Sequence, residues 1–287
     1  MRVLSIGEII FDIYGDSAVI GGAPLNFCAH CALLGAESAL ISAVGNDGYS
    51  EKAIEKLKKF GVDTSFVKRS VLPTGKCIVT MDENAVPCYD VIRPAAYDDI
   101  ILNEEDIKEI RKFSADVFAF GTLIQRENNS ENALRKILSE CTFGEIFCDV
   151  NLRSGCYNEA SCRLCLENAT ILKLSDEEEP LLASFGFYEK KADREEIVRE
   201  ISAKFPNIKL ILFTMGENGS MVYEKKNNKF YCFDAVRVNA VSTVGAGDSY
   251  SAAFLCEYLK SGDVEKSGNA GTKLSAEVVS VKDAVPM

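Results

Sequence analysis

The feature that most constrains the fold of this chain is a repeated alternation of short apolar segments with helical ones. Apolar runs rich in Ile, Leu, Val and Phe are separated by stretches with helical patterning. Strands that alternate with helices in this way form a parallel sheet with helices on both faces. The expected strands are residues 2–6, 9–13, 38–44, 116–120, 145–149, 170–174 and 210–214, the first two being one strand interrupted at Gly7 and Glu8. The expected helices are residues 25–34, 50–60, 130–140, 159–168, 192–204 and 249–259.

One stretch departs from this alternation. Residues 76–81 and 86–92 are rich in β-formers, and the short polar turn 82–84 between them indicates an antiparallel hairpin. Pro87 suits only an edge strand, because it lacks the N–H group that a ladder needs. The chain has no Pro/Ser-rich linker and no internal repeat. We therefore expect a single α/β domain over 1–287.

The hairpin is expected to belong to a small β lid over a site. The lid would be formed from about residues 13–20 and 72–96. It is also a candidate surface for a homodimer, and a decorative insertion is the alternative.

The charge balance argues against a nucleic-acid partner. Asp and Glu number 43 against 32 Lys and Arg, which gives a net charge of −11, whereas binding to a phosphate backbone needs clustered bases. Small anionic substrates remain allowed, because a few backbone N–H groups suffice for them. No apolar run approaches the roughly 18 residues of a membrane span. Residues 1–5 lead straight into a strand with no secretory signal, so we expect a cytoplasmic protein with no membrane partner.

The cysteines are expected to be reduced thiols packed in the core. There are 11 of them, an odd number, scattered through apolar patterns. The two Cys-x-x-Cys pairs, Cys28/Cys31 and Cys162/Cys165, lie in helical stretches without a glycine-rich knuckle, which disfavours a zinc site. His30 is the only histidine, and its Ala/Cys/Leu-rich helix offers no setting for a His-based triad.

The most informative segment is Thr243-Val244-Gly245-Ala246-Gly247-Asp248, which leads into a helix. Glycines before a helix let backbone N–H groups converge, and the positive end of the helix dipole favours an anion there. Asp248 has two interpretations: an acid that stabilises the dipole, or a base beside a phosphate being transferred. The segment lacks the third glycine of a dinucleotide fingerprint, and no phosphate-binding Gly-x-x-x-x-Gly-Lys loop occurs elsewhere.

A second glycine-rich segment, Gly21-Gly22-Ala23-Pro24-Leu25-Asn26, also opens a helix. Upstream of it, Asp12 lies near the end of the first strand pattern, where open α/β sheets bind ligands. A carboxylate, an amide and exposed glycine backbone together suit the vicinal hydroxyls of a sugar. Each residue alone could equally be a turn or a cap.

Taken together, these motifs resemble the PfkB-type carbohydrate kinases, and among them most closely the fructokinases. The resemblance runs nearly end to end and rests on residues 21–26 through 42–48 and on 245–248. It implies a ribokinase-like three-layer α/β/α sandwich with a mostly parallel sheet and a small β-hairpin lid. It also implies that Asp248 is the base for the acceptor hydroxyl. The implied anion hole is Gly245, Ala246 and Gly247, and the implied sugar site is Asp12, Gly21, Gly22 and Asn26.

Shorter matches extend the resemblance. Arg93, in the segment 93–98, is similar to an Arg that reaches the sugar or its phosphate, and Arg153 to a phosphate contact. A cap or a salt bridge is the alternative for both arginines. Glu178 matches the carboxylate that organises magnesium, through water. The resemblance implies ATP-binding roles for Lys173, Ser175, Thr214, Gly216 and Gly219.

The chain also departs from the family pattern, chiefly on the nucleotide side. Ser242 stands where the family has an Asp that helps to build a monovalent-cation site, so activation by potassium is in doubt. Ser175 replaces an Asn, Thr272 lies where an adenine-pocket Asn is common, and Asp283 replaces a late Gly.

The expected function is therefore that of an ATP-dependent sugar kinase. It would use Mg²⁺ and transfer the γ-phosphoryl group to a primary hydroxyl of a small sugar, fructose first. Ribose, 2-keto-3-deoxygluconate or a nucleoside are the alternative acceptors. A catalytically inactive sugar-binding regulator is the alternative from another class. An oxidoreductase is disfavoured, because no Gly-x-Gly-x-x-Gly follows the first strand.

Overall fold

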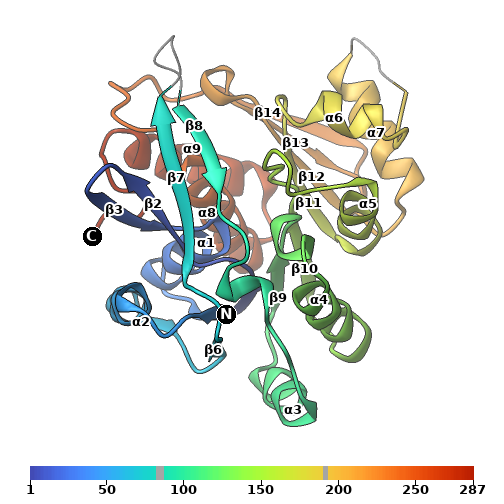
Figure 1. Cartoon of the computed structure of the whole chain (residues 1–287). Helices are drawn as coiled ribbons and strands as arrows, with labels where there is room; N and C mark the ends of the chain where they lie inside the picture. Colours follow the sequence, from blue (N-terminus) through green and yellow to red (C-terminus); the bar gives the residue numbers. More distant parts are fainter. Residues whose placement is uncertain (82–86, 190–192) are drawn as a thin grey trace.

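The computed structural model describes residues 1–81, 87–189 and 193–287. Within them a ten-stranded sheet runs in the order β14-β13-β12-β11-β10-β9-β1-β4-β5, with β6 beside β4 (Figure 1). Its strands are β1 (Arg2–Ile6), β4 (Glu37–Val44), β5 (Val62–Asp63), β6 (Val67–Arg69), β9 (Val117–Phe120), β10 (Glu145–Asp149), β11 (Ile171–Ser175), β12 (Leu210–Thr214), β13 (Ser220–Glu224) and β14 (Lys229–Phe233).

The pairing is parallel from β5 through to β12, as the alternation of strands and helices predicts. Only β13 and β14 run antiparallel, as a hairpin added to the edge beyond β12. Parallel strands need crossover helices, so their carboxyl ends all meet at one edge of the sheet. That edge is where open α/β sheets bind ligands.

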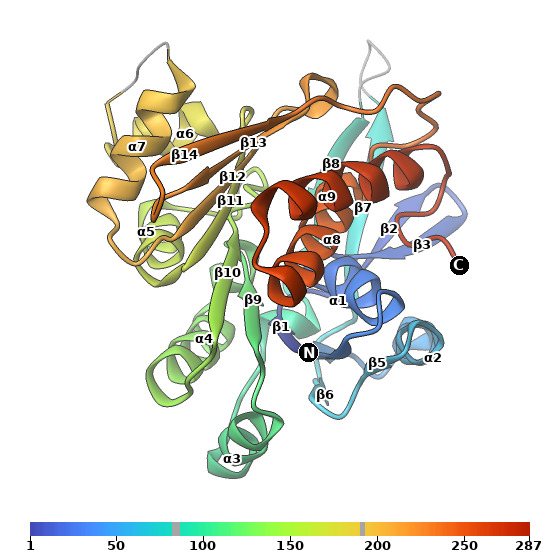
Figure 2. The same ribbon diagram turned by 180° about the vertical axis from the view of Figure 1, so that it is seen from behind.

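Helices cover both faces of the main sheet, giving three layers (Figure 2). One face carries α1 (Ala23–Leu33), α2 (Gly48–Phe60), α8 (Ala246–Ser261) and α9 (Val264–Val279). The other carries α3 (Glu104–Phe113), α4 (Asn128–Glu140), α5 (Glu159–Asn168), α6 (Glu179–Ser184) and α7 (Arg194–Lys204). None of the helices in the described ranges is long and apolar enough to cross a bilayer.

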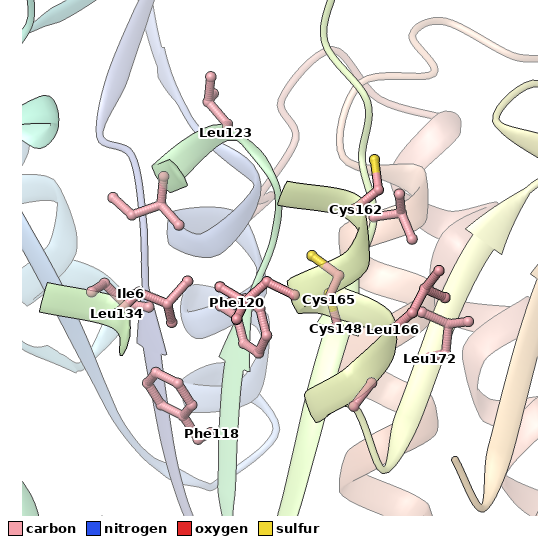
Figure 3. Packing of buried hydrophobic residues seen from close by; sticks show 14 of the residues in the cluster. Ile6, Phe118, Phe120, Leu123, Leu134, Cys148, Cys162, Cys165, Leu166 and Leu172 are labelled. Carbon is pink, nitrogen blue, oxygen red and sulfur yellow. The ribbon is translucent and has the colours of Figure 1, made fainter. Parts of the chain in front are cut away.

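Alternate side chains of each central strand pack into two separate hydrophobic cores, one on each face of the sheet. On β1, Val3 packs with α1 and α8, whereas Leu4 and Ile6 pack with the helices of the other face. Figure 3 shows part of that second core, where Cys162 and Cys165 of α5 lie among apolar side chains. As predicted, most cysteines are buried, and every cysteine in the described residues is a free thiol.

A second, four-stranded sheet lies beside the main one, in the order β3 (Ser17–Gly21), β2 (Ile10–Tyr14), β7 (Gly75–Met81), β8 (Pro87–Val91). The predicted antiparallel pairing of β7 with β8 is confirmed, and Pro87 lies on the edge strand. The turn expected at residues 82–84 lies outside the described residues.

The expectation of one interrupted strand over residues 2–13 is wrong, because β1 and β2 belong to different sheets. The chain leaves the main sheet at Gly7. A Cβ atom on Gly7 would lie 2.4 Å from Cγ of Pro24, so only glycine allows the turn to pass this close to α1.

Helix α9 is not predicted from the sequence, because Gly268 and Gly271 lower the helical propensity of this stretch. The structure uses these glycines for close packing. A Cβ atom on Gly268 would lie 2.1 Å from the ring of Phe233, and one on Gly271 would lie 2.9 Å from the ring of Tyr250. Helices α3 and α6 and strands β13 and β14 were also not predicted.

Four helices begin earlier than predicted, α1 at Ala23, α2 at Gly48, α4 at Asn128 and α8 at Ala246. The start expected at Ala192 lies outside the described residues.

Candidate active site

A cavity opens at the carboxyl edge of the main sheet, where β1, β9 and β10 end and α1 and α8 begin. Helix N-termini at this edge offer free N–H groups and the positive end of a dipole. Polar side chains from separate elements line the cavity together with Phe27 and Phe147. The polar ones include Glu8, Thr122, Asp149, Asn151, Asp248 and Ser251.

The glycine-rich segment before α8 forms a tight cap. Gly245 has φ 81° and is the residue before the first helical turn. A Cβ atom there would lie 2.7 Å from Cβ of Ala284, so both the backbone angle and the space require glycine. Ala246, Gly247 and Asp248 are the first three helical residues, so their N–H groups have no partner within the helix.

Asp248 is held by a direct hydrogen bond from Asn26 of α1. The Asn26 Nδ2 atom donates to Oδ2 of Asp248 at 2.8 Å. This contact joins the two glycine-rich segments, although they are 222 positions apart in the sequence. Burial raises the pKa of Asp248 above its usual range, while Asn26 and the positive charges of Lys173 and Arg153 oppose the rise. A carboxylate with a raised pKa is a better proton acceptor than an exposed one.

Lys173 brings positive charge to the same place. Its Nζ lies 2.9 Å from Oδ1 of Asp149, and both side chains are largely buried. A Cβ atom on Gly247 would lie 3.4 Å from that Nζ, so the ammonium group lies against the first turn of α8. Burial alone would lower the pKa of Lys173, but the carboxylates of Asp149, Glu178 and Asp248 raise it.

The other residues predicted to bind the nucleotide lie at the ends of β11 and β12. Ser175 and Thr214 are register partners there. Glu178 accepts the N–H of Ser175 through Oε2 at 2.7 Å and the N–H of Leu152 through Oε1 at 2.9 Å. Gly216 and Gly219 shape the turn after β12, both with positive φ.

On the predicted sugar side, Asp12 of β2 faces Gly21 of β3. Its Oδ2 would lie 3.3 Å from a Cβ atom placed on Gly21. Burial raises the pKa of Asp12, and Arg153 opposes that rise. Gly22, with φ 116°, precedes α1.

Arg93 does not line this cavity but a second one, together with Pro94 and Asp98. It donates to the carbonyl oxygen of Gly155 at 2.5 Å and pairs with Glu127 at 3.8 Å. Ser242 precedes the glycine cap, and its hydroxyl accepts the N–H of Val244 at 3.2 Å.

Glu8 is a further polar residue of the cavity, one that the sequence pattern indicates only as a strand interruption. Its side chain is 5% exposed, and Oε1 accepts the N–H of Ala23 at 3.0 Å. Burial raises the pKa of Glu8 to about 7, despite the opposing N–H groups of Glu8 and Ala23 and the charge of Arg153. The available signal was a carboxyl group inside an otherwise apolar run.

We expect Glu8 to give the protein a pH-dependent stability. Its pKa is about 7 in the folded state against 4.5 as the ordinary value, so the folded state binds more protons between these pH values. The free energy of unfolding should therefore fall as pH rises from 4.5 to 7, by about 3 kcal/mol from this group at about 1.4 kcal/mol per pKa unit. Urea unfolding at a series of pH values, for wild type and Glu8→Gln, isolates the contribution. If the free energy of unfolding depends on pH in the same way for wild type and Glu8→Gln, the predicted contribution of Glu8 is contradicted.

The mostly parallel sheet, the two helical layers and the glycine-capped helix at the carboxyl edge define a ribokinase-like α/β fold. The chain belongs to the PfkB family of carbohydrate kinases, because the model of the pfkB carbohydrate kinase family matches residues 3–287.

Relatives and solved structures agree with the family. The uncharacterized sugar kinase PH1459 of Pyrococcus horikoshii is 30% identical over 277 residues, covering 90% of this chain and 83% of that protein. Its crystal structure in complex with ATP has a TM-score of 0.82 at 27% identity, covering 99% and 94% of the two chains. Fructokinase-2 of Oryza sativa subsp. japonica is 25% identical over 281 residues, covering 90% and 80%. The Vibrio cholerae fructokinase with fructose, ADP and calcium ion shares the fold, with a TM-score of 0.84 at 22% identity and coverage of 99% and 94%.

Proposed function

We propose that this protein is an ATP-dependent kinase that phosphorylates a primary hydroxyl of a small sugar, with fructose as the acceptor. The observation that carries the proposal is the Asn26–Asp248 contact at 2.8 Å, at the start of a glycine-capped helix and beside a cavity. It supports a site in which a sugar hydroxyl and a phosphate meet at Asp248. Because this chemistry consumes ATP, we also place the protein in the cytoplasm.

In the proposed reaction, the oxygen of the sugar hydroxyl bonds to the γ-phosphorus of ATP. Asp248 accepts the proton that this hydroxyl loses. The bond from that phosphorus to the β–γ bridging oxygen breaks, and ADP leaves. The N–H groups of Gly245, Ala246 and Gly247 stabilise charge on the transferred group, which is the main demand of phosphoryl transfer. Lys173 and Arg153 add positive charge near Asp248.

The chain suits magnesium that arrives with the nucleotide. Among the described residues, no group of three or more His, Cys, Asp or Glu side chains could hold a metal ion. Mg²⁺ usually takes one or two carboxylates, several waters and phosphate oxygens, so a complete protein cage is not needed. Both oxygens of Glu178 already accept N–H groups, and we therefore assign it a contact through water. Bound there, Mg²⁺ would neutralise phosphate charge.

We expect fructose to give the highest kcat/KM in a coupled ADP-release assay over a panel of fructose, ribose, 2-keto-3-deoxygluconate and nucleosides. A site that pairs particular hydroxyls leaves buried polar groups unpaired with the wrong sugar, at about 1–3 kcal/mol each. A kcat/KM for ribose or 2-keto-3-deoxygluconate that is ~10-fold higher than for fructose would contradict fructose as the acceptor. The assignment as a kinase would be unaffected. Sugar binding without turnover of any acceptor would instead favour the inactive regulator.

Potassium should stimulate turnover weakly or not at all. The Ser242 hydroxyl is neutral and already accepts an N–H group, so it offsets the lost hydration of a cation less well than a carboxylate. Turnover is compared in potassium and in a large organic cation at equal ionic strength. A rise of more than ~10-fold in potassium would show that other ligands form the site.

We propose that the second sheet, with segments 13–20 and 72–96, is the lid of this single domain and the contact of a homodimer. In the register of β3, β2 and β7, the half-buried Ile13, Ile20 and Ile78 share one face. Partly exposed apolar side chains on one face are typical of a protein contact. Light scattering tests the dimer, and a monomer at micromolar concentration would contradict it.

A further inference from the structure

Glu8 is a buried carboxyl group with no part in the proposed reaction. It follows β1 at the carboxyl edge of the sheet and lines the cavity that Asp248 also lines. Buried carboxyl groups are costly and need partners. The partner of the Glu8 carboxyl group is the backbone of α1, since its Oε1 accepts the N–H of Ala23 at 3.0 Å.

The start of α1 is built around this contact. Ala23 is the first residue of α1, and the preceding Gly22 gives no side-chain cap. Glu8 therefore acts as the cap from outside the helix, and a negative charge is favoured at this end of the dipole. A Cβ atom on Gly22 would lie 2.4 Å from the Glu8 carbonyl oxygen and 3.3 Å from its Cγ, so the glycine makes room for Glu8.

The same helical turn carries the partner of Asp248. The N–H of Asn26 donates to the carbonyl of Gly22 at 2.9 Å, so Asn26 closes the turn that Ala23 opens. The Asn26 side chain then donates to Asp248 at 2.8 Å. A continuous chain of contacts thus leads from Glu8 through one turn of α1 to Asp248.

We propose that Glu8 is a positioning residue for Asp248, which holds the first turn of α1 where the Asn26 amide meets the Asp248 carboxylate. The inference rests on the proposed role of Asp248 as the base. It adds that the orientation of the base depends on a residue from the other end of the chain. A misplaced base loses rate steeply, because proton transfer needs hydrogen-bond distance in the transition state.

The test is a double-mutant cycle on kcat with Glu8→Ala and Asn26→Ala. Glu8→Ala should lower kcat on the order of tenfold, with KM for ATP unchanged within about twofold. Glu8→Gln keeps an acceptor oxygen for the Ala23 N–H and should stay within about threefold of wild type. Glu8→Ala should cost less than about twofold further in the Asn26→Ala background, because both changes break one chain of contacts.

The matched control removes a cap from another helix. Asn103 caps α3 by accepting the N–H of Asp106 at 3.0 Å. Helix α3 precedes β9 and therefore lies at the amino end of that strand, away from the cavity (Figure 1). Asn103→Ala should leave kcat unchanged.

Additive losses in the cycle would overturn the inference, as would a Glu8→Ala variant that raises KM for the sugar with kcat intact, because Glu8 would then contact the acceptor. If wild type phosphorylates no acceptor in the panel, the proposed function fails instead. The same cycle is then measured on the urea midpoint of unfolding. If the midpoint shift of the double variant equals the sum of the two single shifts, the inference is contradicted. A shift of the double variant that is smaller than this sum supports the inference.

Discussion

The Asp248→Asn variant is expected to lose at least ~100-fold in kcat while its affinity for the sugar stays nearly unchanged. General-base catalysis contributes about 10²–10⁴ to such reactions. The amide keeps the size and shape of the carboxylate, and its oxygen can still accept from Asn26. It cannot take up the hydroxyl proton. The measurement is kcat by ADP release together with sugar binding by calorimetry.

The control for this variant is Asp263→Asn. Asp263 also lies at a helix start, where its Oδ1 accepts the N–H of Lys266 at 3.0 Å at the beginning of α9. It follows the carboxyl end of α8, the end away from Asp248, so the change should leave kcat as in wild type. An Asp248→Asn protein that keeps more than about a third of wild-type kcat would exclude Asp248 as the base.

The sequence was most informative where local chemistry and the global fold demand the same residues. Gly245 must adopt a positive φ and also pass close to Ala284, so its type alone indicates a tight cap. The apolar strands of the main sheet are buried on both faces, which makes each one a continuous apolar run. Both features can be predicted before any contact is known.

What the sequence could not provide was the choice of partner. Gly268 and Gly271 are helix breakers by propensity, but in α9 the lost propensity is offset by close packing against Phe233 and Tyr250. Gly7 ends one strand and sends the next into a different sheet, which periodicity does not reveal. Arg93 could be assigned to a sugar by resemblance, but its pairing with Gly155 and Glu127 depends on loops brought together only in the fold.

The second large effect is expected on stability, from Lys173→Met. Removing one partner of a buried ion pair costs about 3–5 kcal/mol, because the remaining charge is left without compensation. Here Asp149, Glu178 and Asp248 all act on the Lys173 ammonium group, so its loss leaves three carboxyl groups close together. The free energy of unfolding should fall by that amount in urea at neutral pH.

The chain offers a matched control in Lys209→Met. Lys209 pairs with Glu145 at 2.9 Å, the same distance as Lys173 to Asp149, but its side chain is 57% exposed against 9% for Lys173. Exposed pairs contribute about 0–1 kcal/mol, so the same chemical change should cost little there. The comparison holds the ion-pair distance fixed, while burial and the number of nearby carboxylates differ between the two lysines.

A double variant, Lys173→Met with Asp149→Asn, identifies the cause of the loss. If the cost comes from an uncompensated Asp149 charge, removing that charge should restore more than about half of the lost free energy, since replacing both partners of a buried pair is often nearly neutral. A double variant as unstable as Lys173→Met alone would place the cost in lost packing or in the other two carboxyl groups. Equal losses for Lys173→Met and Lys209→Met would contradict the buried ion pair as a determinant of stability.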